Sequence, residues 1–278
     1  MNELNLMSLE EMREHEWYVP WSGGKDSTAT ILLMLEYGIP IRQVNHVRMM
    51  WDDEIPATLP VMKEFVDDAA KRLEQYGCRV VIKPCRRTAV DLIEATFVRS
   101  RRGLNGCKYG VSGFMRGHCK LSGLKEDRSK RISDGEFTML GYASDEHKRL
   151  RRLNSKIQSI LASLGVVEEE TYDIVREANM LSPLYSIPCM TRDGCWFCPN
   201  SNKGQREFMR LHYKDLVEKI EWAIEQTEIP LQGLVNRNNW LKDYAKAHPD
   251  DWRWRDCLAI RPKGWIPGQM VMEEMEIK

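Results

Sequence analysis

The glycine-bearing segment Ser22-Gly23-Gly24-Lys25-Asp26-Ser27-Thr28 constrains this chain more than any other feature. It follows a short apolar run at residues 17–21 and leads into an apolar run at residues 29–37 that is typical of a helix. Two glycines let a backbone turn tightly and approach an oxyanion, and the first N–H groups of a helix point toward such an anion. A strand, a glycine pair and a helix in this order therefore predict an anion site.

The side chains of this loop suit a polyphosphate that carries a metal ion. Ser22 and Ser27 offer hydroxyl groups, Lys25 offers a positive charge, and Asp26 offers a carboxylate suited to Mg²⁺. The loop is not a Walker A motif, in which the Gly-Lys-Ser element follows a longer spacer. A plain glycine turn capped by serine is the alternative, and the flanking strand and helix favour the anion site.

Length and composition describe a globular protein with its cysteines in a reducing compartment. The chain has 278 residues, enough for one large domain or for a domain with an appendage. It contains no apolar run near the ~20 residues of a membrane helix, and its first residues do not resemble a signal peptide. We therefore expect a cytoplasmic protein that makes no membrane contact, and the eight cysteines are expected to be reduced thiols or metal ligands.

Basic residues are concentrated in one part of a chain whose net charge is zero. The segment Arg99–Arg131 holds ten lysines and arginines, against only Glu126 and Asp127. Such a density of positive charge suits an anionic partner, and a nucleic acid is the natural candidate. A solvated charged face is the alternative interpretation.

The pattern of apolar residues predicts strands that alternate with helices, which is typical of a mainly parallel sheet. We predict a nucleotide-binding α/β domain at residues 1–200, which includes a cysteine metal site, and a helical, tryptophan-rich appendage at residues 201–278. Ligands of doubly wound sheets lie beyond the carboxyl ends of the strands. We therefore expect three loops, at residues 22–28, 51–56 and 141–146, to converge on one site. The predicted strands are 17–21, 41–49, 78–84, 136–142 and 181–186; the predicted helices are 29–37, 59–76, 89–98, 145–164 and 205–226; residues 103–123 are predicted to form a loop.

The order Ser-Gly-Gly-Lys-Asp-Ser resembles the PP-loop of the N-type ATP pyrophosphatases. Three later segments, Pro56-Ala57-Thr58, Gly117–Lys125 and Gly141–Arg149, are similar in order and spacing to segments of the phosphoadenosine phosphosulfate reductase-like family. The resemblance extends to about residue 215. It implies a Rossmann-like adenine-nucleotide α-hydrolase fold, with a five-stranded, mainly parallel sheet and a helical C-terminal appendage.

The resemblance also implies a set of site residues and ligands. Lys25 and Asp26 would be catalytic, and ATP with Mg²⁺ would be the ligands. In true reductases a cysteine near the C-terminus, beside glutamate, glycine and histidine, is the nucleophile, whereas Cys257 lacks these neighbours and is expected to be structural. Ala143 stands where the family has arginine, which removes one anion contact. The residues expected to bind the nucleotide are Ser22, Gly23, Gly24, Lys25, Asp26, Ser27, Gly141, Glu146 and Arg149.

The cysteines predict a metal centre. Cys195-Trp-Phe-Cys198 has the spacing that lets two thiolates reach one metal, and Cys107 and Cys119 share the basic glycine-rich loop. Four thiolates from two loops suit a 4Fe–4S cluster, with structural zinc as the alternative. Cys189 is the reserve ligand. Cys78 and Cys85 are expected to pack in the core.

These features favour an ATP-dependent adenylating enzyme that releases pyrophosphate and transfers sulfur to a nucleic acid or nucleotide. A sulfonucleotide reductase is one alternative. A nucleotide-binding accessory subunit of a nucleoprotein complex, without catalysis, is another. The sequence leaves open whether the protein assembles as a homodimer or in a larger complex.

Overall fold

The computed structural model describes residues 5–100, 103–117, 119–133, 136–190 and 194–254. The chain divides into two compact units. The first unit consists of residues 1–50, 58–86 and 124–194, and the second consists of residues 51–57, 87–123 and 195–278. The last segment of the second unit begins at Cys195, and the division into two domains at residue 200 stays a prediction.

The first unit contains a five-stranded sheet in the order β3-β2-β1-β4-β5, in which every neighbouring pair is parallel. This confirms the predicted α/β class with a five-stranded parallel sheet. The chain moves from β1 to one side through β2 and β3, and later to the other side through β4 and β5, so the switch point lies between β1 and β4. The strands are β1 Trp17–Pro20, β2 Ile41–Arg48, β3 Val80–Pro84, β4 Thr138–Met139 and β5 Ile157–Gln158.

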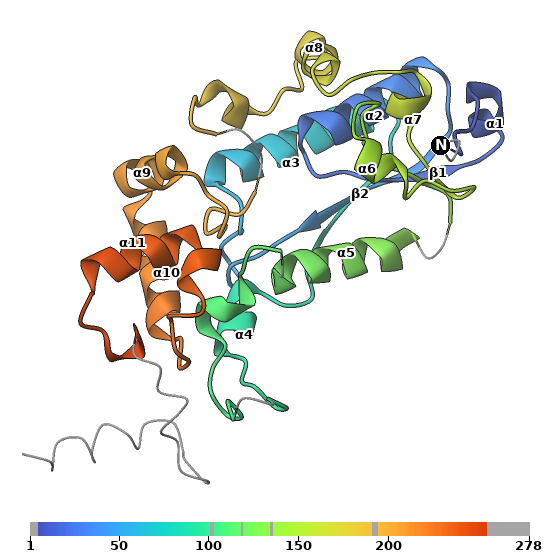
Figure 1. The fold of residues 1–278 in the computed structure, drawn as a ribbon. Coiled ribbons are helices and arrows are strands. Elements are labelled where there is room, and N and C mark those ends of the chain that lie inside the picture. Colours follow the sequence, from blue (N-terminus) through green and yellow to red (C-terminus); the bar gives the residue numbers. More distant parts are fainter. Residues whose placement is uncertain (1–4, 101–102, 118, 134–135, 191–193, 255–278) are drawn as a thin grey trace, which may run out of the picture. The chain divides into compact units, whose positions relative to one another are not determined.

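Helices cover both faces of this sheet, as the residues of β2 require. Val44 to Val47 form an uninterrupted buried run in β2, the pattern of a parallel strand that is covered on both faces. Figure 1 shows α2 (Lys25–Glu36) and α3 (Pro60–Gln75) on one side of β2, and α5 (Lys120–Ser133) on the other. The strands 17–21, 41–49 and 78–84 and the helix 59–76 are confirmed within a few residues.

The fifth strand was placed wrongly. Residues 181–186 contain a 3₁₀ turn, η2 (Pro183–Ser186), instead of a strand. The Ser182 hydroxyl accepts the N–H of Leu184, and proline has a fixed φ that suits the first position of a helical turn, so the chain bends compactly here.

The predicted helix at 145–164 is also wrong. The segment forms α6 (His147–Leu150), then β5, then α7 (Ile160–Ser163). The Asn154 side chain accepts the N–H groups of Lys156 and Ile157, which makes a turn in place of helix. Ser159 then caps α7 through the N–H of Ala162.

Several helices were not predicted. The expected loop at 103–123 includes η1 (Gly110–Gly113) and ends at Lys120, where α5 begins. Others are α1 (Leu9–Arg13), held by a capping box between Ser8 and Glu11, and α8 (Glu170–Glu177), which packs against α2. Within the described ranges, no helix is long and apolar enough to cross a membrane.

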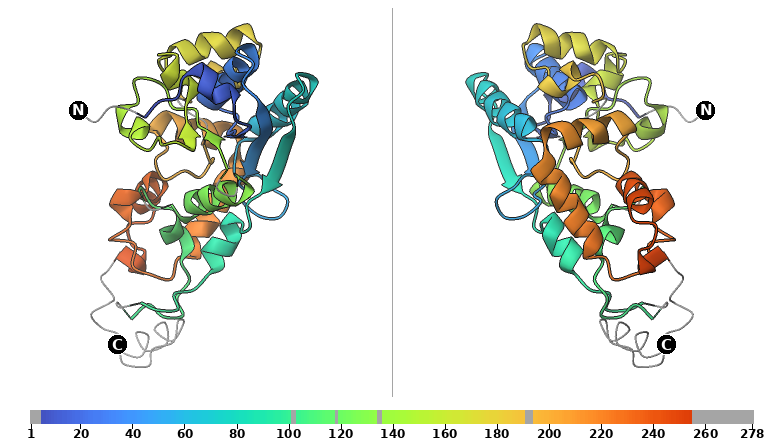
Figure 2. Two further views of the ribbon diagram at one scale, coloured as in Figure 1. Left: turned by 90° about the vertical axis from the view of Figure 1, so that its right-hand side faces the viewer. Right: turned by 90° about the vertical axis from the view of Figure 1, so that its left-hand side faces the viewer.

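The second unit is helical. The predicted helix at 205–226 is two helices that meet at Tyr213, whose backbone (φ −138°, ψ 58°) is not helical. Figure 2 shows α9, α10 and α11 gathered together in orange to red. The elements are α4 Ala89–Glu94, η1, α9 Lys203–His212, α10 Lys214–Glu225, η3 Val235–Arg237, α11 Asn239–Ala247 and η4 Trp252–Trp254; α5 starts in this unit and continues in the first.

Candidate nucleotide site and cysteine site

The glycine pair shapes the start of α2. Gly23 has φ +85°, and a Cβ atom there would lie 2.8 Å from Val66 Cγ2, so both the conformation and the space require glycine. Gly24 is the N-cap of α2, and no side chain caps the helix. The first N–H groups of a helix lack partners inside the helix, so this uncapped end is available to an anion.

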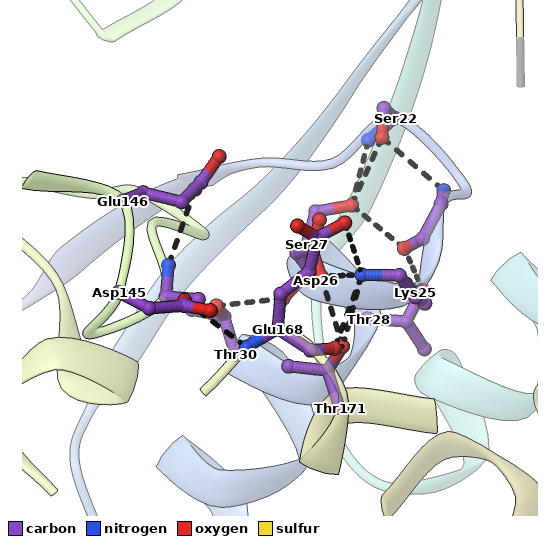
Figure 3. A network of polar contacts seen from close by, with 12 residues as sticks. Ser22, Lys25, Asp26, Ser27, Thr28, Thr30, Asp145, Glu146, Glu168 and Thr171 are labelled. Carbon is purple, nitrogen blue, oxygen red and sulfur yellow. Dashed lines mark hydrogen bonds and ion pairs between the residues drawn. The ribbon is translucent and has the colours of Figure 1, made fainter. Parts of the chain in front are cut away.

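The serines of the loop bond to the loop itself (Figure 3). The hydroxyl groups of Ser22 and Ser27 lie 3.1 Å apart. Ser22 Oγ accepts the N–H of Gly24 at 3.2 Å, and Ser27 Oγ donates to the Gly24 carbonyl at 3.1 Å. These hydroxyls therefore hold the loop in shape, in addition to any contact with a ligand.

Lys25 points into the contact between α2 and α8. Its side chain is 4% exposed, and Nζ donates to Asp26 Oδ1 at 2.6 Å and to the carboxylate of Glu168 at 3.1 Å. Nζ also lies 3.2 Å from the Glu168 carbonyl and 4.8 Å from the centre of the Tyr172 ring. The ammonium group thus joins the loop to the residues around the start of α8 (Figure 3).

Lys25 stays charged in this position. Burial acts to lower the pKa of the amine, but the hydrogen bond and charge of Asp26, and then those of Glu168, outweigh it and hold the pKa above its ordinary value. One ammonium group faces two carboxylates, which leaves an excess negative charge beside the loop. A polyphosphate would be repelled from this charge unless a divalent cation came with it.

Asp26 has one carboxylate oxygen engaged. Oδ1 accepts from Lys25 Nζ and from the hydroxyl of Thr171, the latter at 2.9 Å. The Asp26 side chain is 27% exposed. A partly exposed carboxylate that is fixed through one oxygen suits Mg²⁺, which takes oxygen ligands.

Gly141 meets the loop through its backbone. A Cβ atom at Gly141 would lie 2.9 Å from the carbonyl carbon of Asp26 and 2.9 Å from the nitrogen of Ser27. The chain after β4 therefore packs on the first turn of α2, at the switch point of the sheet.

The two other expected residues after β4 pair with each other. Arg149 lies 2.8 Å from Glu146 Oε1, and Glu146 Oε2 accepts the N–H of Ala143. Asp145 accepts the N–H of Glu168, which links this loop to the start of α8 (Figure 3). A nucleotide contact of Glu146 or Arg149 stays a prediction.

Sequence reasoning missed Glu168, Thr171 and Tyr172, which surround Lys25. They lie about 145 residues beyond the loop, in a charged segment without a motif. The acidic residues 52–54, which were expected near the nucleotide, belong to the second unit. There Asp52 accepts the N–H groups of Glu54 and Ile55 and so shapes its own turn.

His46 is an interior histidine of β2. It is 6% exposed, and its Nδ1 lies 3.0 Å from the Trp21 carbonyl. Burial, together with the positive charges of Lys125 and Arg48, lowers the pKa of His46 to about 3, although the bond to Trp21 and the charge of Asp67 oppose this. The imidazole is therefore neutral at pH 7.

This buried imidazole predicts a loss of stability in acid. An unfolded histidine binds a proton below about pH 6.5, whereas folded His46 does not until about pH 3, so stability falls as the pH falls through this window. At about 1.4 kcal/mol per pH unit, His46 should lower the free energy of unfolding by about 2 kcal/mol between pH 7 and pH 5. Urea unfolding at both pH values measures this loss. Between pH 7 and pH 5, the His46→Gln variant should lose about 2 kcal/mol less stability than the unsubstituted protein. The exposed control His147→Gln should follow the unsubstituted protein; an equal loss in His46→Gln would contradict the assignment.

Two of the four expected metal ligands are neighbours in the second unit. Burial raises the pKa of the Cys119 thiol, and the nearby thiol of Cys198 raises it further, while N–H groups of Leu121 and Ser122 act in the opposite direction. Cys119 directly precedes α5, and its sulfur accepts hydrogen bonds from N–H groups in the first turn of this helix. The N–H of Cys198 donates to the Cys195 carbonyl at 3.0 Å, which closes the turn of the Cys-x-x-Cys segment.

The Cys-x-x-Cys turn is fixed by aromatic packing. The Trp196 backbone N–H donates to the Ala57 carbonyl and its indole N–H donates to the Pro56 carbonyl, both at 2.9 Å. The Trp196 ring lies 4.7 Å from the ring of Trp51, and Phe197 packs on both tryptophans. The turn that carries the two cysteines is therefore held by the segment at 51–57.

Cys107 lies in a different setting. It is fully buried with Leu104 and Ile229 in an apolar cluster. In the part of the chain that the structure describes, no three histidine, cysteine, aspartate or glutamate residues are grouped to hold a metal ion. The four-cysteine centre, with Cys189 as reserve, stays a prediction. Cys78 and Cys85 are buried, as expected, whereas Cys257 lies outside the described residues.

Several basic side chains of the 99–131 segment have partners within the second unit. Lys108 donates to Gln226 at 3.0 Å, Arg116 bonds to Asn239, and Lys120 lies 3.3 Å from the centre of the Tyr109 ring. These three basic side chains therefore contact other residues of the protein. Arg99 is exposed, whereas Arg101 and Arg102 lie outside the described residues.

The likeness of this chain to known proteins is one of structure. No family model matches this chain, and no curated protein sequence matches it. Among solved structures, the chain is similar to the U34-tRNA thiolase NcsA from Methanococcus maripaludis with its 4Fe–4S cluster. The two share 14% sequence identity over 91% of this chain and 84% of that chain, with a TM-score of 0.42. At this level of similarity no site residue is transferred.

Proposed function

We propose that this chain is an ATP-dependent adenylating enzyme of the PP-loop type, in the phosphoadenosine phosphosulfate reductase-like branch. One observation carries the proposal: the Ser-Gly-Gly-Lys-Asp-Ser loop begins α2 directly after the central strand, at the switch point of a parallel sheet, with its first turn uncapped. Ligands of this class of sheet bind at that edge, and the uncapped helix end suits the phosphate tail of a nucleotide.

The residues of the loop then have defined tasks. The first N–H groups of α2 bind the β- and γ-phosphates, and Asp26 would hold the Mg²⁺ that accompanies them. An acceptor oxygen attacks the α-phosphorus, the bond to the β-phosphate oxygen breaks, and pyrophosphate leaves. The helix end stabilises the negative charge that develops on the leaving oxygen, and a Mg²⁺ held by Asp26 would add its positive charge there. Lys25, which is bonded to Asp26 and Glu168, keeps the catalytic carboxylate in place.

The finer part of the proposal is sulfur transfer to a nucleic acid or nucleotide, in which sulfur replaces the adenylated oxygen and AMP leaves. Cys119, Cys195 and Cys198 would hold a 4Fe–4S cluster, with Cys107 as the fourth ligand. Held by Cys119, Cys195 and Cys198 alone, with Cys107 facing away, such a cluster would leave one iron open for the incoming sulfur; with Cys107 as the fourth ligand it would have no open iron. The neighbouring thiols of Cys119 and Cys198 fit this group, and Cys107 fits it less well because apolar side chains surround it. The basic segment supports a nucleic-acid acceptor through Arg99 and its neighbours, since Lys108, Arg116 and Lys120 are engaged elsewhere.

The direct test is release of pyrophosphate from ATP and Mg²⁺ over a panel of RNAs, DNAs and nucleotides. Release that depends on one class of acceptor supports the proposal and names the substrate. ATP binding without release over the whole panel would favour the accessory subunit. Sulfite formed from a sulfonucleotide and a thiol would favour the reductase.

The cysteine assignment predicts an iron protein. Anaerobic purification should give a brown sample that absorbs broadly near ~400 nm, and Cys119→Ser and Cys198→Ser should each lose iron and colour. Cys78→Ala, at a buried thiol in the first unit, is the matched control and should keep its iron. A colourless sample that contains zinc would replace the cluster with the alternative metal.

A further inference from the structure

Thr171, in the first turn of α8, contacts the proposed Mg²⁺ ligand from a distant part of the sequence. It is fully buried, and its hydroxyl lies 2.9 Å from Asp26 Oδ1 and 2.7 Å from the Glu168 carbonyl. Lys25 Nζ lies 3.3 Å from the same hydroxyl (Figure 3). A residue 145 positions beyond Asp26 thus bonds to its carboxylate.

The threonine hydroxyl has one proton and two acceptors within reach. The Glu168 carbonyl also receives Lys25 Nζ at 3.2 Å, so it keeps a partner when the hydroxyl turns away. Asp26 Oδ1 is charged, and hydrogen bonds to ionised acceptors are about twice as strong as those between neutral groups. The hydroxyl group of Thr171 therefore donates its hydrogen bond to Asp26 Oδ1. This oxygen then accepts two hydrogen bonds, one from Lys25 and one from Thr171.

The two donors fix the orientation of the Asp26 carboxylate. Both reach Oδ1 from the side of α8, and both come from side chains that are almost fully buried. No hydrogen bond to Asp26 Oδ2 is found among the described residues, and the side chain keeps 27% of its surface exposed. A carboxylate saturated on one oxygen presents the other to a cation.

We propose that Thr171 is a positioning residue that holds Asp26 so that Oδ2 binds the Mg²⁺ of a magnesium–nucleotide complex. This inference rests on the proposed function of the loop. Packing alone does not require the hydroxyl, because valine has the same shape as threonine. The hydroxyl is buried where it costs free energy unless it is bonded, and its bond to a charged group explains its presence.

The test measures Mg²⁺ affinity in the absence of turnover. The probe is the α,β-methylene analogue of ATP, titrated with Mg²⁺ against the full chain. Thr171→Val should bind Mg²⁺ about ten-fold more weakly, the usual effect of losing a residue that orients a metal ligand. Its affinity for the analogue without Mg²⁺ should be unchanged, and Thr171→Ser, which keeps the hydroxyl, should restore Mg²⁺ binding.

Thr30→Val is the matched control. The Thr30 hydroxyl is also buried in α2, but it donates to the Asp26 carbonyl at 2.9 Å and not to the carboxylate. Thr30→Val should keep the Mg²⁺ affinity of the unsubstituted protein. Thr171→Ala provides a second variant if Thr171→Val does not fold.

The outcomes separate this inference from the proposed function. Unchanged Mg²⁺ affinity in Thr171→Val, or equal weakening with and without Mg²⁺, would overturn the positioning role while leaving the nucleotide site in place. Failure of the unsubstituted protein to bind the analogue at any Mg²⁺ concentration would remove the proposed function, and this inference with it.

Discussion

Asp26→Asn is expected to reduce ATP-dependent pyrophosphate release about a thousand-fold. The amide keeps an oxygen for Lys25 and Thr171 but loses the charge that binds Mg²⁺. Loss of metal stabilisation worth ~4 kcal/mol in the transition state corresponds to about three orders of magnitude in rate. Lys25 retains the carboxylate of Glu168, so the fold should survive. Turnover measured at saturating Mg²⁺, with circular dichroism as a check on folding, tests the expectation.

Asp68→Asn is the control for this substitution. Asp68 lies on α3, is 70% exposed, and pairs with Lys71 at the surface. The same chemical change there should leave turnover within about two-fold, because exposed ion pairs contribute little. Turnover of Asp26→Asn close to that of Asp68→Asn would remove the loop carboxylate from the mechanism.

The local sequence predicts the first half of the sheet well. Buried runs and an amphipathic repeat identified β2 and α3 because each is long enough to show its period. It placed a strand at residues 136–142, of which only Thr138–Met139 is β4, and it missed β5, which is two residues long and is defined by its pairing with β4. The apolar residues around β5 repeat at helical spacing, and a single asparagine turn decides against a helix.

The candidate site was predictable where chemistry and spacing are local. Gly23 and Asp26 were identified from their order in one loop, and the structure gives a steric reason for the glycine. The contacts of Lys25 were not predictable, because Glu168 and Thr171 come together with it only when α8 packs on α2. Lys25 was expected to contact phosphate; the structure shows it buried beside two carboxylates, and its contact with phosphate stays a prediction.

The backbone contact of Gly141 leads to the second large prediction. Gly141→Ala would place a methyl group 2.9 Å from backbone atoms of both Asp26 and Ser27, and backbone cannot rotate aside as a flexible side chain does. The first turn of α2 or the chain after β4 must therefore shift. Overpacking of this kind costs ~1–3 kcal/mol of stability. Because the displaced atoms form the proposed phosphate site, affinity for magnesium–ATP should fall at least ten-fold, measured by calorimetry.

Gly123→Ala separates this steric effect from the general effect of replacing glycine. Gly123 lies exposed in α5, nothing lies within 4 Å of the added Cβ atom, and alanine favours a helix by ~1 kcal/mol over glycine. This control should be as stable as the unsubstituted protein or slightly more stable, with unchanged affinity for magnesium–ATP. Since Gly141 and the loop belong to the same unit, a loss of affinity in Gly141→Ala alone would link nucleotide binding to the start of α2. Equal affinity in both variants would mean that ATP binds elsewhere, or that the loop tolerates the shift.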